Sequence, residues 1–177
     1  MFNETSKANY LTIAAKKGAF IYNGQEITAR QFSGTITGIT LKHDPGNKKE
    51  KIAPGDIATL QMTGDDNGTE ERVFFQIPLR GFLGKKFLCA LPNVETHFLT
   101  FAINLDKETD FCNLFTGFRI DASNETKPIW AKYKFKFDKD GDILNDRKET
   151  QDPAEIIKKW CELMSLNFTD ARTPAAE

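Results

Sequence analysis

Hydrophobic and polar residues alternate along much of the chain, and this pattern predicts a protein built mainly of β-strands. The clearest alternation lies at residues 129–137, where Ile129, Ala131, Tyr133, Phe135 and Phe137 form one set and Trp130, Lys132, Lys134 and Lys136 form the other. In a strand the two sets point to opposite faces. We therefore expect one face to enter the core and the other to display an indole ring and three ammonium groups.

Further alternating segments predict strands at residues 32–42, 56–63, 71–79, 98–105 and 111–120. An earlier hairpin is expected at residues 19–29, because Asn23-Gly24 is the preferred pair for a type I′ turn. Within residues 32–42 the apolar positions change from even to odd numbers across Gly38. A glycine at such a change predicts a β-bulge or a sharp bend.

Two segments change to helical spacing. Residues 82–91 carry an apolar stripe that ends before Pro92. Residues 151–168 begin with Asp152 at the N-cap, Pro153 at the first helical position and Glu155 three residues after the cap. The stripe of this second helix contains Ile156, Ile157, Trp160, Leu163 and Met164. We expect it to dock on the rest of the protein; a helix that binds a partner is the alternative.

The order of these elements predicts the fold. A bent strand comes first, two strands follow, and a helix separates them from the next strands, which is the order of an OB-fold, a small Greek-key barrel that binds oligonucleotides. We expect a mainly β protein: an OB-fold-like barrel over residues 1–145, with one internal helix and an inserted β-hairpin, then a C-terminal helix and short tail over residues 146–177. An SH3-like barrel and an irregular β-sandwich are the alternatives.

The composition limits which partners and which cellular compartment are expected for the protein. The net charge of the 177 residues is −1, so a nucleic-acid site must be a local basic patch. The 15 phenylalanines exceed the needs of a core this size and leave some rings for a surface. Three scattered cysteines without a CxxC motif argue against a disulfide framework and for a reducing cytosol. Neither a signal peptide nor an apolar run of about 18 residues is present, so no membrane partner is expected.

Candidate binding residues are aromatic and basic. Trp130 with Lys132, Lys134 and Lys136 can stack a base and neutralise phosphates. Arg72 and Phe74 repeat this chemistry on the polar side of residues 71–79. Lys48, Lys49 and Lys51 form a basic cluster in the loop at residues 43–55. The alternatives are a solvated lysine ladder that protects an edge strand and a loop cluster that serves solubility alone.

Motifs for catalysis and metal binding are weak. Residues 138–142 read DKDGD, but their glycine stands fourth, where a calcium-binding EF-hand loop has its glycine sixth, so a hairpin turn is expected. His43 and His97 are not in metal-ligand spacing. The chain has no P-loop, GxSxG or HExxH motif. We therefore expect no catalytic residue, no metal, no cofactor and no enzymatic activity.

Four segments together resemble phage-type single-stranded DNA-binding proteins with an OB-fold. They read FSGTITGI at residues 32–39, FFQIPL at 74–79, FLCALPNV at 87–94 and PIWAKY at 128–133, and the resemblance covers about residues 10–137. It implies a role in DNA replication, recombination or repair in the cytosol of a bacterium or its phage-infected host. Such proteins often end in a long acidic tail; here Asp170, Arg172 and Glu177 are the only charges in the last eight residues, so recruitment through a tail is not expected.

The leading hypothesis is sequence-tolerant binding of single-stranded DNA, with replication proteins and further copies of the chain as additional partners. A structural or adaptor barrel that binds proteins is the first alternative, and a carbohydrate-binding module is the second. Salt distinguishes the first two, because binding to nucleic acid weakens steeply with salt and an apolar protein interface responds little.

Overall fold

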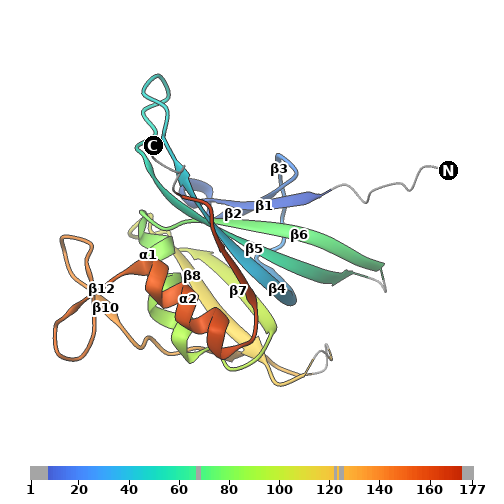
Figure 1. Ribbon diagram of the computed structural model, residues 1–177. Helices are drawn as coiled ribbons and strands as arrows, with labels where there is room; N and C mark the ends of the chain where they lie inside the picture. Colours follow the sequence, from blue (N-terminus) through green and yellow to red (C-terminus); the bar gives the residue numbers. More distant parts are fainter. Residues whose placement is uncertain (1–7, 67–68, 122, 124–125, 173–177) are drawn as a thin grey trace.

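A ten-stranded sheet that curls into a half-barrel forms the body of the protein (Figure 1). The computed structural model describes residues 8–172, apart from 67–68, 122 and 124–125. The sheet has the strand order β3-β2-β1-β6-β5-β4-β7-β8-β9, with β13 paired to β4. Its strands are β1 (Asn9–Ala14), β2 (Ala19–Tyr22), β3 (Gln25–Glu26), β4 (Gln31–Asp44), β5 (Gly55–Asp66), β6 (Thr69–Pro78), β7 (Phe98–Leu105), β8 (Cys112–Arg119), β9 (Ile129–Trp130) and β13 (Asn167–Asp170). The prediction of a mainly β protein is confirmed.

β4 is the strand that joins the two halves of the sheet. On one edge it pairs with β5 through residues 35–44, and on the other edge it pairs first with β7 and then with β13. Its pairing with β5 shifts register between Ile36 and Gly38, which confirms the predicted bulge. A Cβ atom at Gly38 would lie 3.0 Å from the carbonyl oxygen of Asn167, so glycine permits the close approach of β13.

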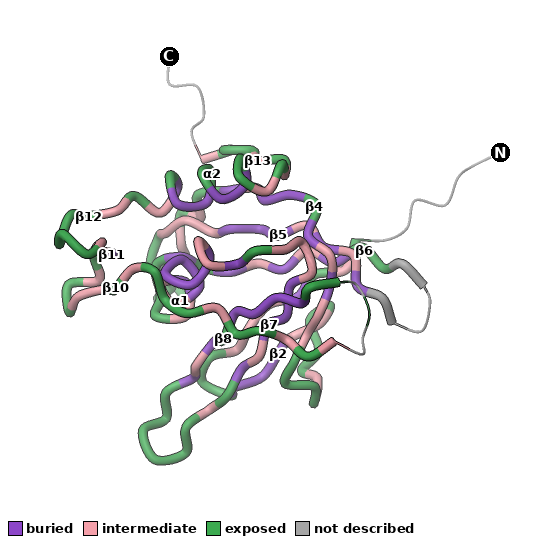
Figure 2. Tube along the Cα trace, turned by 90° about the horizontal axis from the view of Figure 1, so that it is seen from below, coloured by how far each residue is buried: buried purple, intermediate pink, exposed green. Residues whose placement is uncertain are grey.

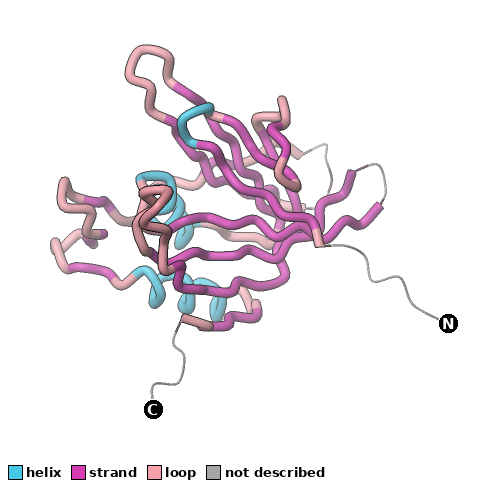
Figure 3. The backbone as a smooth tube through the Cα atoms, turned by 90° about the horizontal axis from the view of Figure 1, so that it is seen from above, coloured by secondary structure: helices cyan, strands magenta, loops and turns pink. Residues whose placement is uncertain are grey.

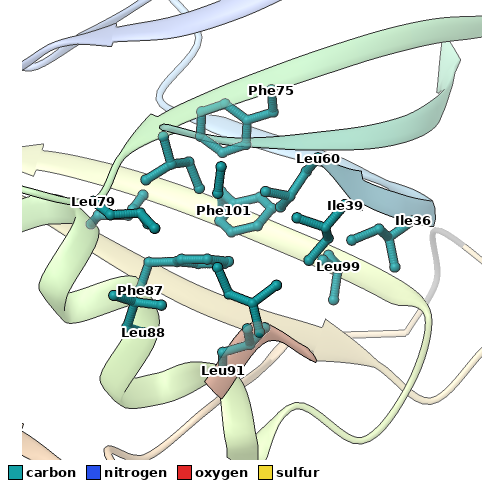
Figure 4. Close-up of a cluster of buried hydrophobic side chains, with 14 of the residues drawn as sticks. Ile36, Ile39, Leu60, Phe75, Leu79, Phe87, Leu88, Leu91, Leu99 and Phe101 are labelled. Carbon is teal, nitrogen blue, oxygen red and sulfur yellow. The ribbon is translucent and has the colours of Figure 1, made fainter. Parts of the chain in front are cut away.

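The core fills the inside of the half-barrel (Figure 4). Phe75 from β6 and Phe101 from β7 meet edge to face, with ring centroids 4.9 Å apart. The helix α1 (Phe82–Ala90) lies between β6 and β7 in the chain and buries Phe87 and Leu88 against this cluster. Each large apolar side chain removed from water contributes about 1.5–3 kcal/mol. α1 therefore closes one end of the half-barrel, at the place that the spacing of residues 82–91 predicts.

The second helix, α2 (Pro153–Leu163), docks on the half-barrel as expected. The carboxylate of Asp152 accepts a hydrogen bond from the amide of Ala154 and caps its first turn. Ile156, Ile157 and Trp160 are buried, and the indole Nε1 of Trp160 donates a 3.0 Å hydrogen bond to the carbonyl of Val94. Of the expected stripe only Leu163 is exposed, whereas Met164 after it packs against the core.

The end of α2 corrects the sequence prediction, which extended the helix to residue 168. Ser165 adopts a left-handed conformation with φ of 56°. The amide of Leu166 donates to the carbonyl of Cys161 at 2.8 Å, and that of Ser165 donates to Glu162 at 3.2 Å. This pair of bonds is a Schellman motif, which satisfies the last carbonyls of a helix and turns the chain away. The following residues form β13, parallel to β4, where the sequence predicted helix and tail.

A second, three-stranded sheet projects beside α2 (Figure 3). It contains β10 (Lys136–Phe137), β11 (Ile143–Leu144) and β12 (Thr150–Gln151). Its first turn is held by the carboxylate of Asp138, which accepts hydrogen bonds from the amides of Asp140 and Asp142. Residues 138–142 are therefore the hairpin turn that was expected. Within the described part of the chain, neither helix combines the length and apolarity needed to cross a membrane.

Candidate nucleic-acid interface

The segment at residues 129–137 is not the continuous strand that its alternation predicts. β9 contains only Ile129 and Trp130, and pairing with β8 continues for one further bond, from the amide of Ala131 to the carbonyl of Thr116. The chain is irregular from residue 131 to 135 and resumes strand structure at β10. Ile129 and Tyr133 are exposed, although the alternation places them in the core.

The cause of this break is the C-terminal end of α1. The last carbonyls of a helix have no partner within the helix. The amide of Lys134 donates to the carbonyl of Cys89 at 2.8 Å, and the side-chain amide of Asn93 donates to the carbonyl of Lys132 at 2.7 Å. These two bonds hold residues 132–134 against the end of the helix and away from β8. The predicted row of Trp130 and three lysines on one strand face therefore does not form.

The irregular stretch instead creates an aromatic patch, which we define as Phe115, Trp130 and Tyr133. These side chains are 42%, 43% and 49% exposed. The rings of Phe115 and Trp130 meet edge to face with centroids 6.3 Å apart. With Thr116, Ala131 and Lys132, the three rings line a shallow depression of about 410 Å³. Exposed rings around an open depression are suited to stack unpaired bases.

Gly117 positions the indole ring of Trp130. The two residues are directly paired across β8 and β9. A Cβ atom at Gly117 would lie 2.8 Å from Cε3 of Trp130 and 3.0 Å from the carbonyl oxygen of Ile129. Only a residue without a side chain allows the indole to lie this close to β8.

The three lysines of the segment are all exposed, but they lie in different surroundings. Figure 2 shows the part of the chain that carries β10, β11 and β12 projecting from the buried core, coloured mostly as exposed or intermediate. Lys132 lines the depression of the aromatic patch. Lys134 lines a neighbouring pocket of about 240 Å³ with Phe135 and with Lys159 of α2. Lys136 belongs to β10, in the second sheet. The structure therefore brings only Lys132 of the predicted trio into the same depression as Trp130.

Arg72 and Phe74 lie on the outer face of β6, as predicted. The Phe74 ring is stacked on Tyr10 of β1, with centroids 5.6 Å apart and planes at 29°. The guanidinium carbon of Arg72 lies 5.6 Å from the centre of the Phe74 ring, within the range of a cation–π contact. We call Tyr10 and Phe74 the Tyr10/Phe74 stack. Four strands, β5, β4, β7 and β8, separate it from β9 in the sheet order.

Lys48, Lys49 and Lys51 form a third, separate basic site. They lie in the loop between β4 and β5, which projects from the body of the protein (Figure 1). All three side chains are exposed. The side-chain oxygen of Asn47 accepts a 3.0 Å hydrogen bond from the amide of Lys49 and so shapes the loop.

Sequence reasoning missed three of the exposed rings. The alternation places Tyr133 in the core, because the pattern continues through residues where the strand itself is broken. Phe115 follows another apolar residue, Leu114, so alternation alone predicts no face for it; in the structure Leu114 and Thr116 are buried and Phe115 is exposed on the opposite face. Tyr10 lies in β1, which was not predicted; the apolar residues Leu11 and Ile13 alternate there over only a few residues.

The surroundings of Tyr133 in the aromatic patch favour the neutral form of its phenol. Partial burial of the Tyr133 phenol, followed by the influence of Cys89, raises the pKa of Tyr133 above its ordinary value, so its hydroxyl remains a hydrogen-bond donor at neutral pH. No group of three or more His, Cys, Asp or Glu in the described ranges is arranged to hold a metal ion. The site offers stacking surfaces, hydrogen-bond donors and ammonium groups.

Comparison with known protein families, with curated protein sequences and with solved structures finds no match to this chain.

Proposed function

We propose that this protein binds single-stranded DNA without sequence preference and that the aromatic patch is the main contact. The observation that carries the proposal is the exposure of Phe115, Trp130 and Tyr133 around one depression that Lys132 also lines. Every base has an aromatic face, so stacking on such rings does not depend on sequence. The bases of a duplex are already stacked and paired, and the patch discriminates against them.

The proposed fold assignment is an OB-fold-like barrel. The order β4, β5, β6, α1, β7, β8 supports it, because a bulged first strand serves two halves of the sheet and a helix follows the third strand. Binding requires no catalytic residue in this proposal. We place the activity in DNA replication, recombination or repair in the cytosol of a bacterium or its phage-infected host, with replication proteins or further copies of the chain as additional partners.

The two tryptophans of the chain provide the test. Trp160 is buried and Trp130 is exposed, so a ligand that stacks on the aromatic patch changes the fluorescence of Trp130. We expect a dT oligomer to quench this fluorescence, a duplex of equal length to quench it far less, and the quenching to disappear in Trp130→Phe. Failure of both oligomers to bind, or equal affinity for the single strand and its duplex, would contradict the proposal.

Salt dependence separates phosphate contacts from stacking. Each phosphate contact on a single strand contributes about −0.7 to the slope of log K against log salt. We expect Lys132→Ala to reduce this slope by up to that amount. Lys136→Ala is the matched control, since its ammonium belongs to the second sheet.

A protein-binding adaptor is the second candidate function, and one observation favours it. Phe82 and Phe111 are exposed beside a mostly apolar groove of about 300 Å³, whose walls include Ile13, Ile77 and Leu83. The fluorescence titration with oligonucleotides and a protein-capture assay at two salt concentrations together decide between the two functions. A chain that captures protein but no oligonucleotide, at an affinity insensitive to salt, supports the adaptor.

A further inference from the structure

The aromatic patch and the Tyr10/Phe74 stack lie on one continuous face of the sheet. Direct cross-strand pairs connect Arg119 of β8, Phe98 of β7, Thr35 of β4, Thr63 of β5 and Arg72 of β6. Directly paired residues point to the same face of a sheet. The alternate residues, among them Leu99, Met62 and Val73, are in the core. The five residues therefore form a row across the outer face, which we call the outer row.

Each end of the outer row adjoins one of the two aromatic surfaces. On β8, Arg119 is two residues from Gly117, against which Trp130 lies. On β6, Arg72 is two residues from Phe74. Residues two apart on a strand share a face. Trp130 and Phe74 are thus oriented to the same side of the sheet, at opposite ends of one row.

The middle of the outer row leaves room for the backbone of a DNA strand that crosses the sheet. Thr35, Thr63 and Phe98 are half-buried and Arg119 is buried, so none of these four residues places an exposed charge between the two aromatic surfaces along this row. Beside it, the hydroxyl groups of Ser33 and Thr100 share a 2.9 Å hydrogen bond, and the Thr37 hydroxyl donates to the carbonyl of Gln61 at 3.2 Å. The basic group of Arg72 remains exposed at the β6 end.

The dimensions set the length of strand that can reach both surfaces. From β9 to β6 the sheet order contains five strand spacings. At about 4.8 Å per spacing the path is about 24 Å long. This equals about seven nucleotides at the stacked rise of about 3.4 Å. It falls within the range of about 4–16 nucleotides that single OB-folds occupy.

We propose that one DNA strand of about seven or more nucleotides contacts the aromatic patch and the Tyr10/Phe74 stack together, crossing the outer face along the outer row. This inference rests on the proposed function. It adds that the chain has two stacking surfaces for one ligand and a threshold in ligand length. A shorter oligomer occupies one surface at a time, whereas a longer one gains from the high effective concentration of its second half.

The test compares dT3 with dT12 by quenching of Trp130 fluorescence in the full chain. We expect dT12 to bind more than tenfold tighter than dT3 after correction for its overlapping binding positions. Phe74→Ala should weaken dT12 binding by roughly 5- to 150-fold, the value of one stacked base, and leave quenching by dT3 unchanged. Unchanged quenching by dT3 also shows that the variant is folded.

Two further variants complete the experiment. Tyr10→Ala removes the other ring of the stack from an exposed position and should reproduce the effect of Phe74→Ala. Phe111→Ala removes an exposed ring outside both surfaces and should leave dT12 binding unchanged.

Normal dT12 binding in both Phe74→Ala and Tyr10→Ala would overturn the two-surface proposal while leaving the proposed function in place. Absence of quenching by either oligomer in the wild-type chain, without detectable binding, would overturn the proposed function itself.

Discussion

Trp130, whose indole ring is exposed, is the residue on which the binding hypothesis depends most. We expect Trp130→Ala to weaken binding of single-stranded DNA by about 1–3 kcal/mol, because one stacked base is lost. The salt slope should not change, since stacking releases no counterions. Affinities measured at three salt concentrations test both statements. A loss of about 3–5 kcal/mol in unfolding free energy, with normal affinity in the folded fraction, would instead assign the indole a structural role.

Gly117 offers a second test of the same ring without removing it. In Gly117→Ala the new methyl group would collide with Trp130, so the indole must move away from β8. We expect affinity for single-stranded DNA to fall and the emission of Trp130 to shift, as measured by fluorescence.

Gly81→Ala is the matched control for this substitution, because nothing lies within 4 Å of a Cβ atom at Gly81 and its φ is an ordinary −78°. Equal affinities for wild type, Gly117→Ala and Gly81→Ala would show that the position of the indole does not matter for binding.

The residue types of the candidate binding site could be predicted from the sequence better than their arrangement. Trp130 is exposed and Phe74 is half-buried, and each belongs to the polar set of its alternating segment. The alternation predicts the wrong place for Tyr133, because the position of this residue depends on the hydrogen bond from the amide of Lys134 to the carbonyl of Cys89. That bond joins the segment to a helix more than forty residues earlier, and local alternation carries no information about it.

At the scale of the elements, β13 ends in an ion pair that links it to β5. Arg172 donates to both carboxylate oxygens of Asp170, at 2.9 and 2.8 Å, and its Nη1 lies 3.2 Å from Asp56 at the start of β5. Hydrogen bonds from Arg172 lower the pKa of Asp170 to about 2.

A carboxylate with a lowered pKa stabilises the fold above its ordinary pKa and loses this contribution as the pH falls toward the lowered value. For Asp170 the window lies between about pH 4 and pH 2. We expect Arg172→Ala to return the pKa of Asp170 toward its ordinary value, as followed by NMR titration of its carboxyl carbon. A pKa that stays near 2 in the variant would show that another group holds the carboxylate.

The two ends of α2 differ in how far the sequence determines them. Asp152, Pro153 and Glu155 are adjacent in the chain, and their cap is visible as a local pattern. The end depends on the left-handed conformation of Ser165, a residue type without a preference for it, and on the pairing of β13 with β4. A contact between such distant segments cannot be found from the periodicity of either segment.

For the whole molecule, α2 and β13 together close the half-barrel. Trp160, Ile157 and Cys161 are buried against it, and β13 covers the edge of β4. We expect truncation after Asp146 to lower the melting temperature, because apolar surface and strand edge are exposed together. Thermal unfolding followed by circular dichroism measures the change. An unchanged melting temperature would show that these elements do not contribute to stability.

The three cysteines report on opening of the whole core. All are buried, and burial raises the pKa of Cys89 to about 11 and that of Cys161 to about 12. The thiolate is the reactive form, so we expect negligible alkylation of the native protein at pH 8 and rapid alkylation in denaturant. Mass spectrometry counts the modified thiols. Fast modification under native conditions would indicate that the core opens frequently.

The parallel pairing of β13 with β4 also has a consequence for biosynthesis. Gly38 and its neighbours leave the ribosome long before Asn167, the residue that pairs with Gly38. At about 5–20 residues per second, this part of β4 has no β13 partner for roughly 6 to 26 s in each nascent chain. An unpaired strand edge can pair with another polypeptide. The interval lengthens whenever translation of the intervening residues slows, so the speed of the ribosome determines how long each new molecule is open to misassembly.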